Sequence, residues 1–332
     1  MSTQLVAFDF GDKSLKMAYF QDDVLQKTVA IEMPENIVAD GQIVSADAMS
    51  DFIAEAAKAH DIARKDAAVI LPPSLAAVRT VTVPLMSESQ LKYNLPYEFK
   101  DYLTEDKNKY AIDYEVLETI HDEEGKPTQQ RLFACAVLKD VIDRYEMILD
   151  RAGFRLKVAV PEEYVYTKLF RGDIGPGNVK EGTYALLDVG QTSSRFYILR
   201  NGEFNTKRTV DLGIKVLEEI IAKAKPCDIH LAHNYKMTNY ENVLNSEKCV
   251  DYYNRLAVEL LKAVNFYNYN NRTDELKDIY LIGGGSAIAP LVQALHAVAD
   301  VTVHSAGELL GSDLEQENSY LLLRAICCGA GE

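Results

Sequence analysis

Residues 183–210 read TYALLDVGQTSSRFYILRNGEFNTKRTV, and residues 4–29 read QLVAFDFGDKSLKMAYFQDDVLQKTV. In both stretches a short apolar run ends in an aspartate, a glycine stands two residues later, and a second run, a tight turn and a third run follow. Thirteen residues separate the aspartate from the turn in each copy. A pair such as Asn-Gly between alternating hydrophobic residues is a strong hairpin signal. The chain therefore contains an internal repeat of three antiparallel strands.

Each copy of the repeat is followed by helical material and then by another strand. Helical periodicity is present at residues 46–59 and 213–224, and apolar runs typical of strands follow at 67–72 and 278–282. Each half is thus predicted to hold three antiparallel strands, helices and a further strand, a mixed α/β arrangement that occurs twice. The stretch 171–182, rich in glycine and charge, is the predicted linker between the halves.

Two additional segments interrupt this plan. Residues 84–153 predict a small α+β subdomain, with an amphipathic helix, two strands and a second helix, and residues 226–275 are mostly helical and polar. The predicted domains are a first core subdomain of 1–83 and 154–180, the inserted subdomain of 84–153, a second core subdomain of 181–225 and 276–332, and a helical insertion of 226–275.

The composition excludes several classes of function. The 332 residues include 35 basic and 50 acidic side chains, a formal net charge of −15, which disfavours binding to nucleic acid and to anionic lipid. No run approaches the roughly 20 apolar residues that span a bilayer, no secretory signal is visible, and the five cysteines are scattered. These features are typical of a cytoplasmic protein with reduced thiols.

Three glycine-bearing loops follow predicted strands, which is where α/β sheets bind ligands. Glycine allows sharp turns that expose backbone N–H groups to an anion, and hydroxyls add donors. Asp9 and Asp188 precede the first two loops and would hold Mg²⁺ through water, or would merely cap turns. The loop residues are Gly11, Asp12, Lys13 and Ser14; Gly190, Gln191, Thr192 and Ser193; and Gly283, Gly284, Gly285 and Ser286.

Other ligand motifs are weaker. The triple glycine lacks the third glycine of the dinucleotide fingerprint, and the absence of Gly-Lys-Ser/Thr excludes a P-loop NTPase. Cys227, His230 and His233 have a spacing that would suit a metal, but no fourth ligand is evident, which favours a surface segment.

The loops DFGDKS, DVGQTSS and LIGGGSAI resemble the two phosphate motifs and the adenosine motif of the actin-like ATPases. Three longer stretches narrow the resemblance to the PilM family, the cytoplasmic actin-like proteins of type IV pilus assembly. It implies an actin-like (ribonuclease H-like) α/β fold, with duplicated domains around a nucleotide cleft and an FtsA-like small subdomain at 84–153. The stretches are AAVILPPSLAAVRTVTVPLMSESQLKYNLPYEFKDYL, FACAVLKDVIDRYEMILDRAGF and VELLKAVNFYNYNNRTDELKDIYLIGGGSAI.

The resemblance also implies ligands, ATP and Mg²⁺, and roles for individual residues. Asp9 and Asp188 match the acidic residues near the metal, and the glycines of the three loops, with Gly213, match nucleotide-binding positions. Glu259 and Lys262 resemble the pair beside ribose and adenine, although their spacing equally suits an ion pair within a helix. Glu162 is the candidate for orienting a hydrolytic water.

The sequence also departs from the family pattern. Asp12 stands where a small hydroxyl residue is usual, and its charge would repel a phosphate about 4 Å away by roughly 1–4 kcal/mol. AVPEEY lacks an aspartate common in the linking segment, and DLGIKV at Gly213 lacks a second glycine. These departures predict a weak ATPase at most.

The leading interpretation is an ATP-binding adaptor of a type IV pilus, or of a related secretion or competence machine. It would dock the N-terminal tail of a PilN-like inner-membrane protein and so lie at the inner face of the membrane. Aromatic residues in LPYEFKDYL at 95–103 would line such a docking groove, or form the core of the subdomain. Alternatives are a nucleotide-free scaffold, a small-molecule kinase of the same fold, and an FtsA-like filament protein, which the lack of a basic C-terminal amphipathic helix disfavours. Self-association is left open.

Overall fold

The computed structural model describes residues 3–34, 36–39, 42–171, 181–297, 301–305, 307–310 and 319–330. The chain divides into two compact units, which we call unit 1 (residues 1–166 and 324–332) and unit 2 (residues 167–323). The linker predicted at 171–182 lies almost wholly outside the described residues. The subdomain boundaries expected from the sequence therefore stay a prediction.

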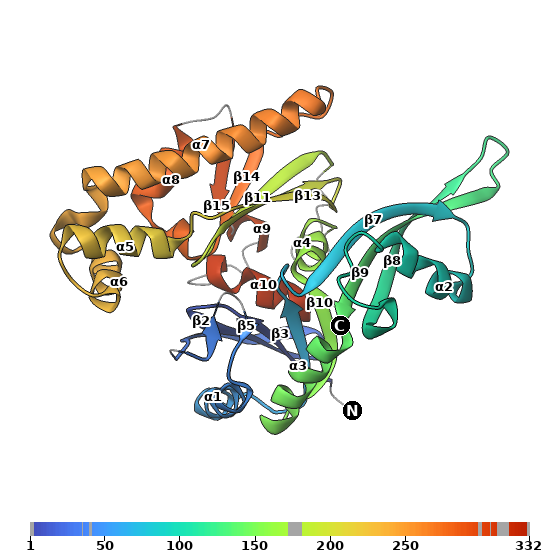
Figure 1. Cartoon of the computed structure of the whole chain (residues 1–332), viewed down its shortest axis with the longest axis horizontal. Coiled ribbons are helices and arrows are strands. Elements are labelled where there is room, and N and C mark those ends of the chain that lie inside the picture. The colour runs from blue at the N-terminus through green and yellow to red at the C-terminus, as the bar shows by residue number, and fades with distance from the viewer. Residues whose placement is uncertain are drawn as a thin grey trace. The chain divides into compact units, whose positions relative to one another are not determined.

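Unit 1 contains a five-stranded sheet in the order β10-β6-β1-β2-β3 (Figure 1). β1 pairs antiparallel with β2, which pairs antiparallel with β3, while β6 and β10 extend the sheet in parallel on the other side of β1. The strands are β1 (Gln4–Phe10), β2 (Ser14–Gln21), β3 (Val24–Glu32), β6 (Asp66–Leu71) and β10 (Arg155–Pro161), with a small pair β4 (Val38–Ala39) and β5 (Gln42–Ile43) beside them.

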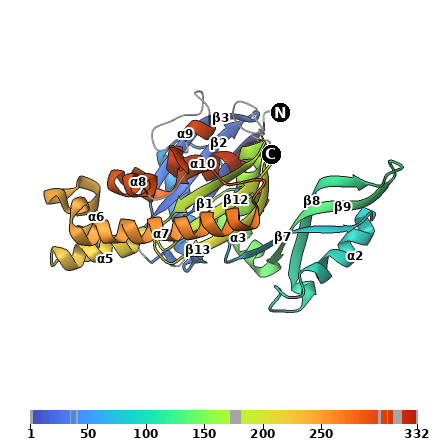
Figure 2. The same cartoon turned by 90° about the horizontal axis from the view of Figure 1, so that it is seen from above.

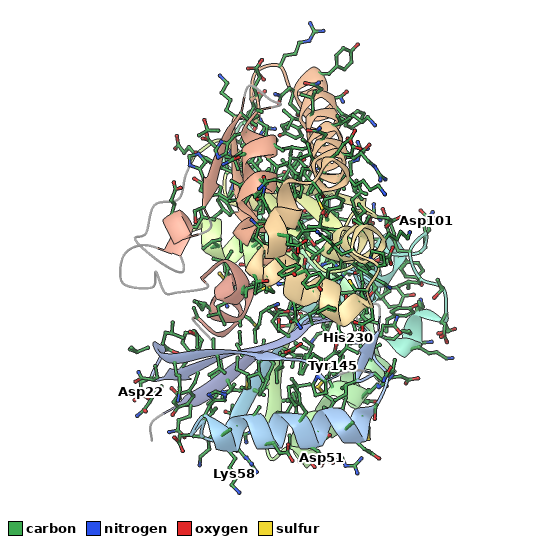
Figure 3. All side chains as sticks on the ribbon, turned by 90° about the vertical axis from the view of Figure 1, so that its left-hand side faces the viewer. Asp22, Asp51, Lys58, Asp101, Tyr145 and His230 are labelled. Carbon is green, nitrogen blue, oxygen red and sulfur yellow. The ribbon has the colours of Figure 1, made fainter. Side chains whose placement is uncertain are left out.

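Helices α1 (Ala46–Ala59) and α3 (Lys139–Arg151) contribute to the same core as this sheet. Ser45 caps α1 by accepting a hydrogen bond from the N–H of Ala48, which satisfies one donor of the first turn. Figure 3 shows Asp51 and Lys58 on the outer side of α1, away from the sheet, as expected for an amphipathic helix.

A separate three-stranded sheet, in the order β7-β9-β8, forms the inserted subdomain of unit 1. It contains β7 (Ala76–Pro84), β8 (Tyr110–His121) and β9 (Pro127–Leu138), and the single-turn helix η1 spans Lys107–Lys109. Helix α2 (Glu88–Glu98) lies along one face of this sheet (Figure 2), and Leu91, Leu95 and Phe99 enter its core. A capping box of Ser87 and Gln90 fixes the start of α2.

Unit 2 repeats the sheet of unit 1, in the order β13-β12-β11-β14-β15. Helix α7, orange in Figure 1, crosses one face of this sheet and shares a core with α5 and α8. The strands are β11 (Thr183–Val189), β12 (Ser194–Arg200), β13 (Glu203–Val210), β14 (Asp278–Ile282) and β15 (Thr302–Ser305). The helices are α5 (Ile214–Ala224), α6 (Ile229–Thr238), η2 (Tyr240–Asn245), α7 (Glu247–Asn270), η3 (Gly284–Ala287), α8 (Ala289–His296) and α9 (Gly307–Leu310).

Two helices continue from one unit into the other. α4 (Glu162–Arg171) starts in unit 1, at the end of β10, and its Phe170 stacks on Tyr184 of unit 2. α10 (Ser319–Gly329) starts in unit 2 and ends on the sheet of unit 1. Gly329 lies so close to that sheet that a Cβ atom on it would be 2.3 Å from the ring of Phe20.

The predicted duplication is confirmed, with one correction. Both sheets hold three antiparallel strands, and the turns at Asp22 and Asn201 have positive φ values of 50°, as tight hairpin turns require. The sequence predicted one further strand in each half, whereas each sheet has two, because β10 and β15 join in parallel at the edge. Among the described residues, each helix is too short or too polar to cross a bilayer.

Candidate functional site

The two predicted phosphate loops have the same backbone geometry. The N–H of Gly11 donates to the carbonyl of Ser14 at 3.0 Å, and the N–H of Gly190 donates to the carbonyl of Ser193 at 3.1 Å. A Cβ atom on either glycine would lie 3.1 Å from that serine carbonyl oxygen, which is tight. The repeat therefore extends to the conformation of the loops. Asp12, Lys13, Thr192 and the two serines lie half-buried in these loops.

A basic residue faces each predicted metal ligand across the hairpin, a feature that was not predicted from the sequence. Asp9 pairs in register with Lys16, and Asp188 with Arg195. Lys16 Nζ lies 2.9 Å from Asp9 Oδ2, and Arg195 Nη1 lies 3.8 Å from Asp188 Oδ2. Seven residues separate acid and base in both copies, so the signal was present in the sequence.

In unit 1, Asp9 and the candidate catalytic residue Glu162 meet at one arginine. Arg324 of α10 contacts Asp9 Oδ2 at 3.0 Å through Nη2 and Glu162 Oε2 at 2.8 Å through Nη1. Burial alone would raise the pKa of the Asp9 carboxyl, but Arg324 and Lys16 outweigh burial and hold it below its usual value. Asp9 is therefore a buried carboxylate whose charge is already balanced by side chains of the protein.

In unit 2, close packing of glycines brings the predicted loops together. A Cβ atom on Gly213 would lie 2.3 Å from the carbonyl oxygen of Gln191, and one on Gly283 would lie 2.3 Å from Asp188 Oδ1. Gly285 packs as closely against the side chain of Val189. Only glycine fits such approaches, and Gly283 also has a φ of +79°. By contrast, the Cβ position of Gly284 has no neighbouring atom within 4 Å in the part of the chain that the structure describes.

Hydroxyl side chains within and beside these loops hold them in place. The Ser194 hydroxyl donates to the carbonyl of Leu212 at 2.6 Å, and the Ser286 hydroxyl donates to the carbonyl of Gly283 at 2.7 Å. Tyr252 of α7 donates to the carbonyl of Gly213 at 3.0 Å. The loops are thus fixed by hydrogen bonds before any ligand arrives, which lowers the entropy cost of binding.

Behind the second phosphate loop lies a buried charged cluster that the sequence did not reveal. Glu218 of α5, fully buried, contacts Lys236 Nζ and His233 Nδ1 of α6 at 2.6 and 2.7 Å, and Gln191 Nε2 donates to it at 2.9 Å. Burial would raise the pKa of the Glu218 carboxyl, but Lys236 and the hydrogen bonds from Gln191 and His233 lower it overall. His233 therefore helps to orient the second phosphate loop, because Glu218 contacts both His233 and Gln191. Among the described residues there is no group of three or more His, Cys, Asp or Glu side chains that could hold a metal ion.

Glu259 and Lys262 lie together on α7, as predicted. Lys262 Nζ is 2.6 Å from Glu259 Oε1, and Arg208 of β13 is 2.8 Å from Glu259 Oε2. Glu259 and Lys262 therefore form the ion pair within a helix that their spacing also suited. Arg208 is a further partner of Glu259. A role of this pair beside a nucleotide stays a prediction.

Comparison with known proteins identifies the family. The family described as type IV pilus assembly protein PilM matches residues 8–321. The chain belongs to the PilM family. No curated protein matches it by sequence.

Solved structures agree with the PilM assignment. A chain of a PilM–PilN type IV pilus biogenesis complex is 18% identical, with 99% of both chains covered and a TM-score of 0.79. The ethanolamine utilization protein EutJ from Carboxydothermus hydrogenoformans is 10% identical, with 99% of this chain and 90% of that chain covered and a TM-score of 0.61. At these identities the likeness concerns the fold, which is actin-like, as the sequence predicted.

The two predicted metal ligands differ in how well they suit Mg²⁺. This ion is usually held by one or two carboxylates, with phosphates and water as its other ligands. Asp188, beside the glycine loops, fits that description as a single carboxylate. Asp9 does not, because Lys16 and Arg324 already occupy Oδ2.

Glu218→Gln is expected to reduce the free energy of unfolding by about 3 kcal/mol at pH 7, because Lys236 would stay buried without its counter-charge. The pKa of Glu218 is lowered in the folded state, so its stabilising contribution is present above the unfolded value of about 4.3 and is lost below it. The difference in the free energy of unfolding between wild type and Glu218→Gln should therefore shrink as the pH falls from about 5 to 3, as measured by urea unfolding.

Glu219→Gln is the matched control, since Glu219 is the next residue on α5 and is exposed. It should leave stability within about 0.5 kcal/mol of wild type. An equal loss in both variants, or a difference that does not depend on pH, would argue against the ionised cluster.

Proposed function

We propose that this chain is an ATP-binding, actin-like adaptor of a type IV pilus or related secretion or competence platform. It docks the N-terminal tail of a PilN-like inner-membrane protein and is held at the inner face of the membrane by that partner. The PilM–PilN complex, similar over 99% of this chain, is the observation that carries this proposal. Membership of the PilM family supports it.

The nucleotide part of the proposal rests on unit 2. There Gly283 packs against Asp188, Gly213 packs against Gln191 of the Gly190 loop, and the Cβ position of Gly284 is open. An anion can approach such a backbone closely because no side chain intervenes. Bound there, Mg²⁺ would offset phosphate charge, and Asp188 would be its protein ligand. Because Glu162 accepts a hydrogen bond from Arg324, we propose at most weak ATP hydrolysis.

Gly284→Val is expected to weaken ATP binding at least about tenfold, or about 1.4 kcal/mol, without destabilising the fold. A Cβ atom at Gly284 would have no neighbour within 4 Å among the described residues, so we expect the added side chain to interfere mainly with a ligand that approaches this backbone. Isothermal titration calorimetry with ATP, with and without Mg²⁺, measures the effect. Asp188→Ala should remove the dependence on Mg²⁺.

Ala297→Val, at the exposed C-cap of α8, is the control that places the same valine side chain away from the loop. It should bind ATP like wild type. Absence of ATP binding to wild type at millimolar concentration would contradict the nucleotide part of the proposal. The nucleotide-free scaffold would then be the better description.

The docking part of the proposal points to the inserted subdomain. Of the aromatic and aliphatic residues in LPYEFKDYL, Leu95 and Phe99 belong to the core, whereas Tyr97 and Tyr102 are exposed. Tyr93, one turn before Tyr97 on α2, is exposed as well, and their ring centroids are 6.1 Å apart. Exposed tyrosines such as Tyr93, Tyr97 and Tyr102 supply large contact areas at interfaces.

The double substitution Tyr93→Ser and Tyr97→Ser is expected to weaken peptide binding at least about tenfold, since clustered aromatic residues commonly carry most of an interface's free energy. The probe is a fluorescein-labelled peptide of the N-terminal segment of the PilN-like protein from the same organism. Fluorescence anisotropy measures its affinity for the full chain.

Phe266→Ser and Tyr269→Ser form the matched control, because these α7 residues are 72% and 73% exposed and lie in unit 2. The control should bind the peptide like wild type. Equal affinity in both double variants would move the docking site elsewhere, and no binding to wild type would contradict docking altogether. Since no ATP is needed in this assay, its failure is separate from failure of nucleotide binding.

A further inference from the structure

Arg324 of α10 links two acidic side chains of unit 1 that are far apart in the sequence. Its Nε and Nη2 atoms lie 3.1 and 3.0 Å from Asp9 Oδ2, and its Nη1 atom lies 2.8 Å from Glu162 Oε2. Lys16 Nζ lies 2.9 Å from the same oxygen of Asp9. None of these four side chains is more than 15% exposed. Two carboxylates and two cations thus contact one another in a buried network.

The chemistry of this network decides whether a divalent ion suits it. Mg²⁺ and similar ions need oxygen ligands arranged around them at close to 2 Å, roughly octahedrally. Asp9 Oδ2 already accepts hydrogen bonds from an ammonium and a guanidinium, so a divalent ion at that oxygen would be repelled by both. Removing Arg324 would take away the cation that contacts both carboxylates.

We propose that Arg324 is an internal counter-cation that takes the place of a divalent metal ion at Asp9 and Glu162. While the guanidinium is present, unit 1 has no divalent metal site at these two carboxylates, and removing it turns them into one. This inference does not depend on nucleotide binding, because a metal ion alone can test it.

The test uses Mn²⁺ as the probe, with the full chain and two variants, Arg324→Gln and Arg324→Met. Electron paramagnetic resonance of free Mn²⁺ measures binding, and thermal unfolding with and without Mn²⁺ measures stabilisation. Both variants should bind Mn²⁺ at least about tenfold more tightly than wild type and gain Tm when it is added. Adding Asp9→Asn to Arg324→Gln should abolish both the tighter Mn²⁺ binding and the rise in Tm.

Arg324→Lys is the matched control, because it keeps the positive charge and should bind Mn²⁺ no better than wild type. The proposal is overturned if folded Arg324→Gln binds Mn²⁺ no more tightly than wild type, or if the gain persists with Asp9→Asn. If both neutral variants fail to fold, the wild type decides. Mn²⁺ binding that Asp9→Asn removes from the wild type contradicts the proposal, and absence of such binding supports it.

Discussion

The organisation of both units depends on a buried carboxylate at the end of the first strand. Asp9 and Asp188 are each more than 95% buried, and an ionised carboxylate in such a place is costly unless a cation balances it. The hairpin supplies that cation by register, since the residue seven positions later lies directly opposite. The glycine loop between them has to be short and tightly turned to keep this register. One electrostatic requirement therefore fixes the strand, the loop and the hairpin together.

The units satisfy this requirement differently, and the difference concerns their chemistry. In unit 1 a third partner, Arg324, is added, and it also binds Glu162, so the end of β1 is closed by side chains of the protein. In unit 2 the backbone of Gly283 packs against Asp188 at the end of β11. A glycine contact leaves backbone groups nearby that a ligand can use, whereas an arginine contact fills the same kind of space with charge.

Much of this architecture could be predicted, because it is local in the sequence. The stretch 183–189 is β11, 203–210 is β13 and 46–59 is α1, since hairpin turns and helical periodicity are set by neighbouring residues. β10 was missed because its alternating Arg155, Leu156 and Lys157 lie at a partly exposed edge, and β15 because it has only four residues. Arg324 could not be found, because 315 residues separate it from Asp9 and only the tertiary fold brings them together.

Residues that match the nucleotide-site pattern of the family need not all take part in binding a nucleotide. Asp9 and Glu162 keep the residue types expected of a metal ligand and of a residue that orients a hydrolytic water, yet their oxygens accept hydrogen bonds from Arg324. Arg324 and Lys16 keep the pKa of Asp9 below its usual value, and carboxylate oxygens held in this way offer few lone pairs to a metal ion or a water. Glycines of unit 2, in contrast, are packed so tightly that an added Cβ atom would lie as little as 2.3 Å from a neighbouring atom, so substitution would disrupt them. Binding by backbone loops would not depend on these acidic side chains, whereas hydrolysis would need a carboxylate that can act on a water or hold a metal ion.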